Sequence, residues 1–193
     1  CHSGAGSSIV KQRYDESVVK VRLPLAAEQY ERGEYEAAAE SALKVIEADP
    51  ASAQAHLIYA KSLLAVGNYA QADDHFSTAI DLNPLLDEAW YGRALAADQA
   101  GDRPAAISAM EKVIELNPSN IDAIIQLADI YVSAGEGEKA LAFLNGSMKT
   151  DVRVMKAAAA VYSAIGRTDE AVRLYERLCL DNPKDMRLAE TLG

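Results

Sequence analysis

Aromatic residues are scarce in this chain of 193 residues, and cysteines are rarer still. Phenylalanine, tyrosine and tryptophan make up 6% of the sequence, although half of its residues are hydrophobic. The two cysteines are too few for a disulfide framework, and Cys179, on an apolar helical stretch, is expected to be a buried thiol. No apolar run approaches the roughly 20 residues that a membrane-spanning helix needs. A core with so few large rings must be filled by smaller side chains.

Positive charge is in the minority. Lysine and arginine total 19 residues against 29 aspartates and glutamates, which gives a net charge of −10. This excess of acid disfavours nucleic-acid backbones and anionic lipid surfaces, because both attract the opposite sign. It permits basic partners, and it also serves the solubility of a protein with a large surface.

Motifs that carry catalysis or hold a cofactor are missing as well. The sequence contains no glycine-rich phosphate loop, no nucleophile elbow and no paired cysteines at metal-ligand spacing. Asp73, Asp74 and His75, together with His56, form the one group with metal-ligand side chains. Consecutive residues of a helix point in different directions, so these four cannot all reach one ion. We therefore expect no catalytic residue, no metal site, no cofactor and no enzyme activity within these residues.

What the chain does contain is a short motif, a glycine followed five residues later by an alanine, that returns five times. Successive motif glycines are 34, 34, 34 and 31 residues apart, and a proline lies 17 residues after four of them. The glycines are Gly33, Gly67, Gly101, Gly135 and Gly166, and the prolines are Pro50, Pro84, Pro118 and Pro183. A fixed period of this size indicates a stacked array. Such an array presents a long surface and has no built-in catalytic pocket.

Each repeat contains two segments whose apolar residues are three or four positions apart, which predicts two helices. The glycine supplies the left-handed residue that commonly ends a first helix. In four repeats the residue after it is Glu34, Asn68, Asp102 or Glu136, which is expected to be an N-cap or a first-turn acid of the second helix. Each proline ends a second helix, because the residue before proline avoids helical angles. No stretch alternates with the period of a strand, so the predicted fold class is all-α.

Alanine recurs at two places in the repeat, five residues after the glycine and seven before it. These residues are Ala38, Ala72, Ala106, Ala140 and Ala171 in the second helices and Ala60, Ala94, Ala128 and Ala159 in the first. Small side chains at both places let paired helices approach closely. A larger residue then fills the remaining space at one position of the second helix, where the chain has Phe76, Met110, Leu144 and Tyr175.

These features resemble the tetratricopeptide repeat, a unit of 34 residues with the pattern Trp-x2-Leu-Gly-x2-Tyr, then Ala-x3-Phe, then Pro. Trp90 matches the first position, and Ala72 and Phe76 match the centre of the second helix. Arg93 and Ala94 depart from the usual Leu-Gly. A heptad coiled coil is the structural alternative, but glycine and proline in every half-repeat would interrupt it. The resemblance implies a right-handed α-solenoid of five repeats with a truncated sixth.

The predicted organisation follows from the period. The parts are a flexible tether at 1–8, a lead-in helix at 9–22, five repeats at 19–52, 53–86, 87–120, 121–151 and 152–185, and the start of a sixth at 186–193. Pro24 is expected to end the lead-in helix or to begin the first helix of repeat one.

The fourth repeat is irregular, because it lacks the proline and is three residues short. It has Asn145-Gly146 where its second helix should continue, and a glycine inside a helix costs about 1 kcal/mol relative to alanine. We expect this helix to end near Asn145 and a loop to run to about Thr150. That would alter the superhelical twist between repeats four and five.

The resemblance also implies that the first helices line a concave face where a partner binds. The residues expected on this groove are Tyr30, Leu57, Lys61, Leu64, Tyr91, Leu95, Asp98, Ile125, Asp129, Val132 and Lys156. Apolar strips with acids in the middle and basic residues at one end suit a partner segment with apolar anchors and a basic residue. The alternative is that some of these side chains pack between helices.

One specific partner is not expected. Repeats that grip chaperone C-termini use a clamp of lysine and asparagine on the first helices. The clamp positions here hold Leu23, Ala27, Ile58, Glu88 and Gly92. A terminal carboxylate would find no positive partner among them.

The two ends carry expectations of their own. Cys1 heads a stretch of small polar residues and resembles the acylated cysteine of a processed bacterial lipoprotein, with the stretch as its tether and His2 in keeping with delivery to the outer membrane. The alternative is that Cys1 is not a natural terminus and marks only where the sequence was cut or joined for cloning. Leu192-Gly193 matches the Leu-Gly of a sixth first helix, which indicates a longer parent chain.

Three functions remain open. The first is a non-catalytic scaffold that holds a protein segment in its groove, as an outer-membrane lipoprotein facing the periplasm and touching the membrane only through Cys1. In architecture it is similar to pilus-assembly lipoproteins of the pilotin and tight-adherence type. The second is the recruitment domain of a larger enzyme with catalysis beyond Gly193, and the third is a cytoplasmic adaptor. None of the three involves nucleic acid.

Overall fold

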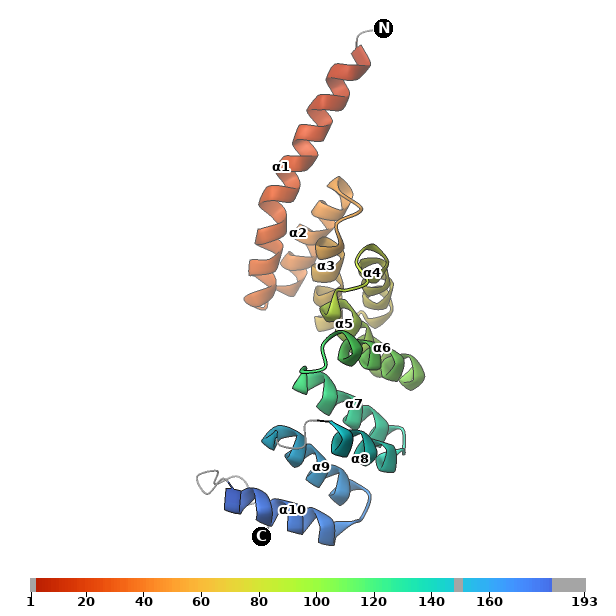
Figure 1. Ribbon diagram of the computed structural model, residues 1–193. Coiled ribbons are helices and arrows are strands. Elements are labelled where there is room, and N and C mark those ends of the chain that lie inside the picture. Colours follow the sequence, from red (N-terminus) through yellow and green to blue (C-terminus); the bar gives the residue numbers. More distant parts are fainter. Residues whose placement is uncertain (1–2, 148–150, 182–193) are drawn as a thin grey trace. The chain divides into compact units, whose positions relative to one another are not determined.

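The computed structural model describes residues 3–147 and 151–181, with side chains from residue 10 onward, and these residues form ten helices and no strand. The helices are α1 (Ser3–Glu31), α2 (Tyr35–Ala48), α3 (Ala53–Ala65), α4 (Tyr69–Leu82), α5 (Asp87–Gln99), α6 (Arg103–Leu116), α7 (Ile121–Ser133), α8 (Gly137–Gly146), α9 (Val152–Ala164) and α10 (Thr168–Asp181). Figure 1 shows their order along the chain. The predicted fold class, an all-α solenoid of paired helices, is confirmed.

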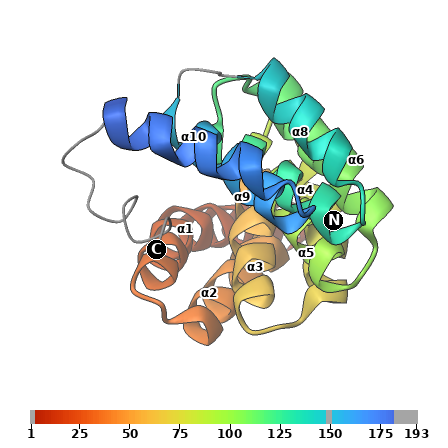
Figure 2. The ribbon, with the colours of Figure 1, turned by 90° about the horizontal axis from the view of Figure 1, so that it is seen from below.

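The chain forms two compact units, Cys1–Ala109 and Met110–Gly193. In the first unit α3 packs against α1, α2, α4 and α5, and in the second α9 packs against α7, α8 and α10. First helices therefore lie beside one another within each unit, as Figure 2 shows for α1 and α3. The second helices α2 and α4 share no comparable contact in the described part of the chain. This asymmetry gives the first helices a common face.

Each first helix ends at a motif glycine in the left-handed conformation, as predicted. The five φ angles lie between 78° and 84°, and no other described residue has a positive φ. At the first turn Gly33 N–H donates to the Tyr30 carbonyl at 2.9 Å, and Glu34 N–H donates to the Gln29 carbonyl at 2.9 Å. This pair of bonds satisfies helix-end carbonyls that would otherwise lack partners.

Three of the four residues predicted after these glycines are N-caps of the second helices by position, but their side chains make no capping bond. They are Glu34, Asn68 and Glu136, whereas Asp102 Oδ1 accepts from Ala105 N–H at 3.2 Å. Three first helices have side-chain caps of their own, at Ser52, Asn120 and Asp151. These three residues have extended backbone, which aims the side chain at the helix start. The backbone at the other three positions does not.

Helix α1 differs from what the sequence led us to expect. It is one helix from residue 3, so residues 3–8 form its first turns instead of a tether, and Pro24 lies inside it. Residues 1–2, with Cys1, lie outside the described residues. Proline in a helix interior costs about 3 kcal/mol, but Leu23 and Ala26 pack with Ala42 of α2 and Ile58 of α3 on either side of it. This packing holds α1 together through the proline.

The helix pairs meet at their alanines. All nine predicted alanines are 0–2% exposed. Phe76, Met110 and Leu144 fill the space between the pairs as expected and are buried, whereas Tyr175 is half-buried. Cys179, expected to be buried, is only half-buried as well.

The second helices end where the sequence indicates. α2, α4 and α6 each stop two residues before a proline. α8 ends at Gly146, which confirms the expected end near Asn145. Residues 148–150 of the expected loop and 186–193 of the expected sixth repeat lie outside the described residues. The change of twist between repeats four and five stays a prediction.

Gly92 in α5 gives a test of this packing, because a Cβ at that position would overlap the Phe76 ring of α4. We expect Gly92→Ala to destabilise the protein by about 1–3 kcal/mol, the usual range for overpacking a core. Gly146→Ala is the matched control, since its Cβ would meet nothing within 4 Å, and it should be neutral or slightly stabilising. Urea unfolding of the two variants measures both effects. Equal stability of the two variants would contradict the packing described.

Candidate functional site

The predicted groove residues fall on first helices at helical spacing, so each helix contributes one stripe. In α3 the stripe is Leu57, Lys61 and Leu64. Leu57 is 1% exposed and belongs to the core with Ala60 and Phe76, so its assignment to the groove is wrong. Ala89 of α5 belongs to the same buried cluster as Leu57.

Lys61 joins three helices of the first unit. Its Nζ lies 4.8 Å from the centre of the Tyr30 ring of α1 and 3.0 Å from Glu88 Oε2 of α5. The Tyr30 ring also lies 5.5 Å from the Tyr35 ring of α2. The stripes of α1, α3 and α5 are therefore adjacent, and they form one continuous surface. We call this surface the inner face, made of Tyr30, Lys61, Leu64, Glu88, Tyr91, Leu95 and Asp98.

The α5 part of the inner face is half-buried along its length. Tyr91, Leu95 and Asp98 each keep part of their side chain accessible, and Leu64 of α3 packs against the core while remaining partly exposed. Leu64, Tyr91 and Leu95 are thus three partly exposed apolar side chains, and Asp98 is the one acid beside them. Such a surface offers contact area to an apolar side chain and a partner to a cation.

The second unit carries the remaining predicted residues. Ile125 and Val132 of α7 pack against the core from its edge, and Lys156 of α9 is half-buried. The surroundings of Asp129 desolvate its carboxylate, which raises the pKa of that group above its ordinary value. A cation placed beside Asp129 would offset this desolvation.

Sequence reasoning missed the role of Glu88. It was considered only as a clamp position, yet it neutralises Lys61 across the face. The two residues are 27 apart in the chain, so no local pattern shows the pair. Of the other four clamp positions, Ile58 and Gly92 are buried and therefore not available to a ligand, whereas Leu23 and Ala27 are half-buried.

The histidines of the first unit form a structural pair. His56 Nδ1 and His75 Nδ1 are 2.9 Å apart, and His56 Nε2 lies 3.2 Å from the Pro50 carbonyl, which can only accept. His56 Nε2 is therefore the donor of the bond to Pro50, and the direction of the bond between the two Nδ1 atoms depends on which of them carries the proton. Both nitrogens of His56 are in use, which removes it as a metal ligand. Within residues 3–147 and 151–181 no group of three metal-ligating side chains comes together.

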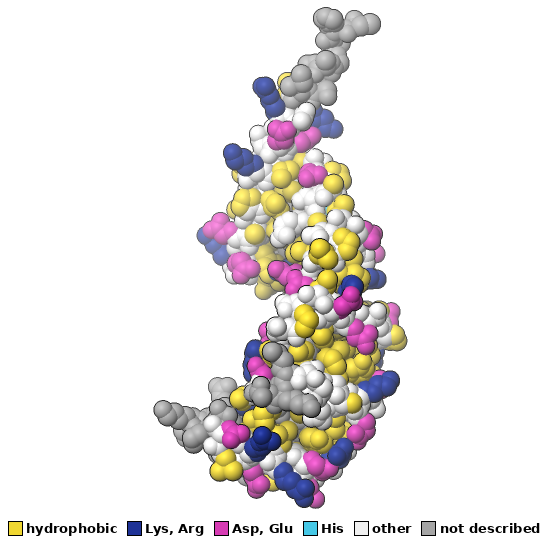
Figure 3. Space-filling model, in the orientation of Figure 1, with side chains coloured by type: hydrophobic (Ala, Val, Ile, Leu, Met, Phe, Trp, Pro, Cys, Tyr) yellow, Lys and Arg dark blue, Asp and Glu magenta, His cyan; other side chains and the backbone are white. Residues whose placement is uncertain are grey.

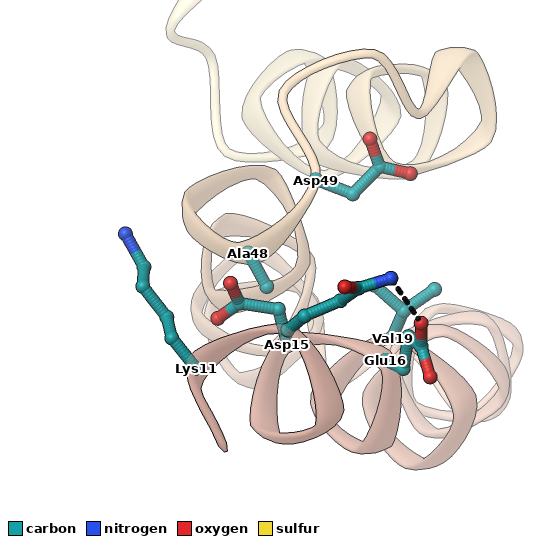
Figure 4. Close-up of a pocket in the computed structure, with 7 residues that line it drawn as sticks. Lys11, Asp15, Glu16, Val19, Ala48 and Asp49 are labelled. Atoms are coloured by element: carbon teal, nitrogen blue, oxygen red, sulfur yellow. Dashed lines mark hydrogen bonds between the residues drawn. The ribbon is translucent and has the colours of Figure 1, made fainter. Parts of the chain in front are cut away.

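The end of α2 forms a hollow with α1, lined by Lys11, Gln12, Asp15, Glu16, Val19, Ala48 and Asp49 (Figure 4). Gln12 Nε2 donates to Glu16 Oε1 at 3.1 Å along α1. The lining mixes one cation with three acids and is open to solvent. These side chains do not converge on one point, so we assign no ligand to this hollow.

None of the described helices combines the length and the apolarity that a bilayer crossing requires.

Comparison with known families agrees with the architecture. Matches to the tetratricopeptide repeat cover residues 23–65, 60–121, 99–153 and 154–186. The chain belongs to the tetratricopeptide repeat family, whose domains are protein–protein interaction scaffolds.

Individual relatives share parts of the chain. A tetratricopeptide repeat and J domain-containing co-chaperone of Cryptococcus neoformans is 33% identical over 91 residues, which are 47% of this chain and 17% of that protein. The chain spans between 11% and 17% of the curated relatives it matches.

Solved structures share the fold over a longer stretch. The crystal structure of MamA has a TM-score of 0.75 at 23% identity and covers 89% of this chain and 96% of its own. The second tetratricopeptide repeat domain of human RPAP3, solved with the HSP70 peptide SGPTIEEVD, has a TM-score of 0.57 at 26% identity. That likeness covers 60% of this chain and 97% of the RPAP3 domain.

The histidine pair is expected to make the stability of the fold depend on pH. Burial, and then the nearby His56, lower the pKa of His75, and Asp74 opposes them. The unfolded chain then binds a proton before the folded one, so stability should fall as pH drops below about 6.5. We expect the melting temperature to decrease between pH 7.5 and 5.5, and to decrease less in His75→Gln. Equal decreases in the wild type and the variant would rule out this contribution.

Proposed function

We propose that the chain is a non-catalytic protein-binding module whose inner face holds a segment of a partner protein. The observation that carries this proposal is the continuity of the inner face across α1, α3 and α5 through Lys61. The structure of the RPAP3 domain with a bound peptide supports it, because that domain has the same kind of helix array.

The charges on the inner face indicate the chemistry of the partner. Lys61 is neutralised by Glu88, and Asp98 adds a carboxylate that makes no ion pair among the described residues, one helical turn from Leu95. An acidic peptide such as the one bound to RPAP3 would meet these carboxylates, whereas a basic residue would be attracted to them. Tyr91, Leu95 and Leu64 provide the apolar contacts. The proposed ligand is therefore a segment with apolar anchors and a basic residue.

The proposed module is part of a larger protein. The chain's small share of its curated relatives supports this, since the matched stretch is 17% of one of those proteins and 12% of another. As a recruitment domain it would bring a partner to an activity located elsewhere in that protein. A cytoplasmic adaptor remains the other alternative from the sequence.

For the cellular location we keep the proposal of an outer-membrane lipoprotein of the bacterial envelope, acylated at Cys1 and of the pilotin or tight-adherence type. It is supported by the resemblance of residues 1–8 to a lipoprotein terminus. Metabolic labelling with an alkyne fatty acid of cells expressing the full reading frame tests it. Label that disappears in Cys1→Ser agrees with the proposal, and an unlabelled wild type refutes it.

Binding of two series of synthetic peptides tests whether the inner face holds a segment with apolar anchors and a basic residue. Peptides of about 15 residues with two leucine anchors, carrying either lysine or glutamate between them, are measured by fluorescence anisotropy. We expect the lysine series to bind and the double variant Tyr91→Ala, Leu95→Ala to lose at least about tenfold in affinity, which is the effect of one or more binding hot spots.

Leu85→Ala is the matched control for this measurement. Leu85 is 76% exposed and lies between α4 and α5, outside the inner face. Its variant should bind like the wild type. An unchanged affinity in the Tyr91 and Leu95 variant would show that the segment binds elsewhere.

A further inference from the structure

Helix α1 has a second apolar stripe that faces away from the repeats. Val10, Tyr14 and Val21 are 69%, 68% and 64% exposed, which places them among the most exposed large apolar side chains of the described residues. Val18 and Leu25 lie between and beyond them and are half-buried. Spacings of four, four, three and four residues put all five on one side of the helix. The stripe runs about 22 Å along α1.

The opposite side of α1 makes the contacts of the solenoid. Leu23, Ala26 and Ala27 belong to the cluster formed with α2 and α3, and Val19 lines the hollow at the end of α2. These residues lie roughly half a turn around the helix from the outward stripe. The stripe is therefore not needed to hold α1 on the array. An end helix normally turns a polar side outward, so an apolar one calls for a separate explanation.

Basic side chains border the stripe. Lys11 and Arg22 lie along one edge and Arg13 and Lys20 along the other, as the helical spacing places them. Figure 3 shows basic side chains around this part of the molecule. None of the four makes an ion pair among the described residues. Residues 10–22 contain these four bases and two acids, in a chain whose net charge is −10.

This charge pattern decides what can cover the stripe. A second copy docked stripe to stripe would bring eight bases together, because each α1 contributes four, and like charges would repel. A bilayer surface suits a helix with one broad apolar side, whereas this stripe is about 80° wide and α1 is apolar on two sides. A partner helix needs only a narrow apolar seam, flanked by charges of the opposite sign.

We propose that the outward stripe of α1 binds an acidic amphipathic helix of a partner protein, with the partner's apolar seam on Val10, Tyr14 and Val21 and its carboxylates on the flanking bases. The site lies on the opposite side of α1 from the solenoid contacts and is distinct from the inner face. Its length matches a partner helix of about four turns. The module would then hold one partner in the inner face and a second on α1.

Two synthetic helices test this proposal. One is a 21-residue peptide with leucine at heptad positions a and d and glutamate at e and g, and its twin has lysine at e and g. Isothermal titration calorimetry with the whole chain should show binding of the glutamate peptide and at least about tenfold weaker binding of the lysine peptide. The triple variant Val10→Ser, Tyr14→Ser, Val21→Ser should lose the binding while its helical circular dichroism stays unchanged.

A charge reversal makes the test specific. In Lys11→Glu, Arg13→Glu, Lys20→Glu, Arg22→Glu the preference should invert in favour of the lysine peptide. Leu85→Ser and Val66→Ser, at other exposed apolar sites, are the controls and should bind as the wild type does.

The competing occupants have their own assays, and each positive result would overturn the proposal. Cosedimentation with phosphatidylglycerol vesicles, lost in the triple serine variant without any binding of the glutamate peptide, would assign the stripe to a membrane. A dimer in sedimentation equilibrium that the serine variant abolishes would assign it to a second copy. Equal affinity for both peptides, or no binding of either peptide, would likewise reject the proposal that the stripe binds an acidic helix.

Discussion

The contact of paired helices at alanine is the constraint on which the rest of the structure depends. Because the recurring alanines have almost no exposed surface, the helix axes approach closely enough for Phe76, Met110 and Leu144 to fill the remaining space in the middle three repeats. The left-handed glycine returns the chain at the distance that this contact requires. Each pair thus buries its own interface, and within each unit the first helix of the next pair packs on both helices of the pair before it. The stripes of those first helices remain at the surface, where they form the inner face.

The side chains of the inner face are linked to one another across helices by charge. Lys61 is held between an aromatic ring and a carboxylate that come from the helices on its two sides. The pair is partly exposed and contributes little to stability, but it fixes the position of the long lysine side chain before a ligand arrives. A surface whose side chains are already ordered loses less entropy on binding. It also leaves the acidic groups of α5 as the attractive feature for a basic segment.

The sequence predicted the features that have a local cause. The helix pairs, the left-handed glycines and the buried alanines follow from the repeat period and the apolar spacing, and the end of α8 near Asn145 follows from the local Asn145-Gly146. Features that depend on distant residues were not predictable in this way. Leu57 has the spacing of a groove residue and becomes part of the core through residues of α4 and α5. The path of α1 through Pro24 depends on packing against α2 and α3, and the pairing of Lys61 with Glu88 joins two repeats.

The location of the binding surface is the central claim, and site-specific photocrosslinking tests it most directly. A benzophenone amino acid is placed at Leu64 or Leu95 on the inner face, and in separate variants at Leu43 or Leu82, which are exposed on second helices. Each variant is irradiated with the best-binding apolar–basic peptide, and the adducts are measured by mass spectrometry. The account predicts strong adducts from Leu64 and Leu95 and background levels from Leu43 and Leu82. Equal or stronger adducts from the second-helix positions would contradict it.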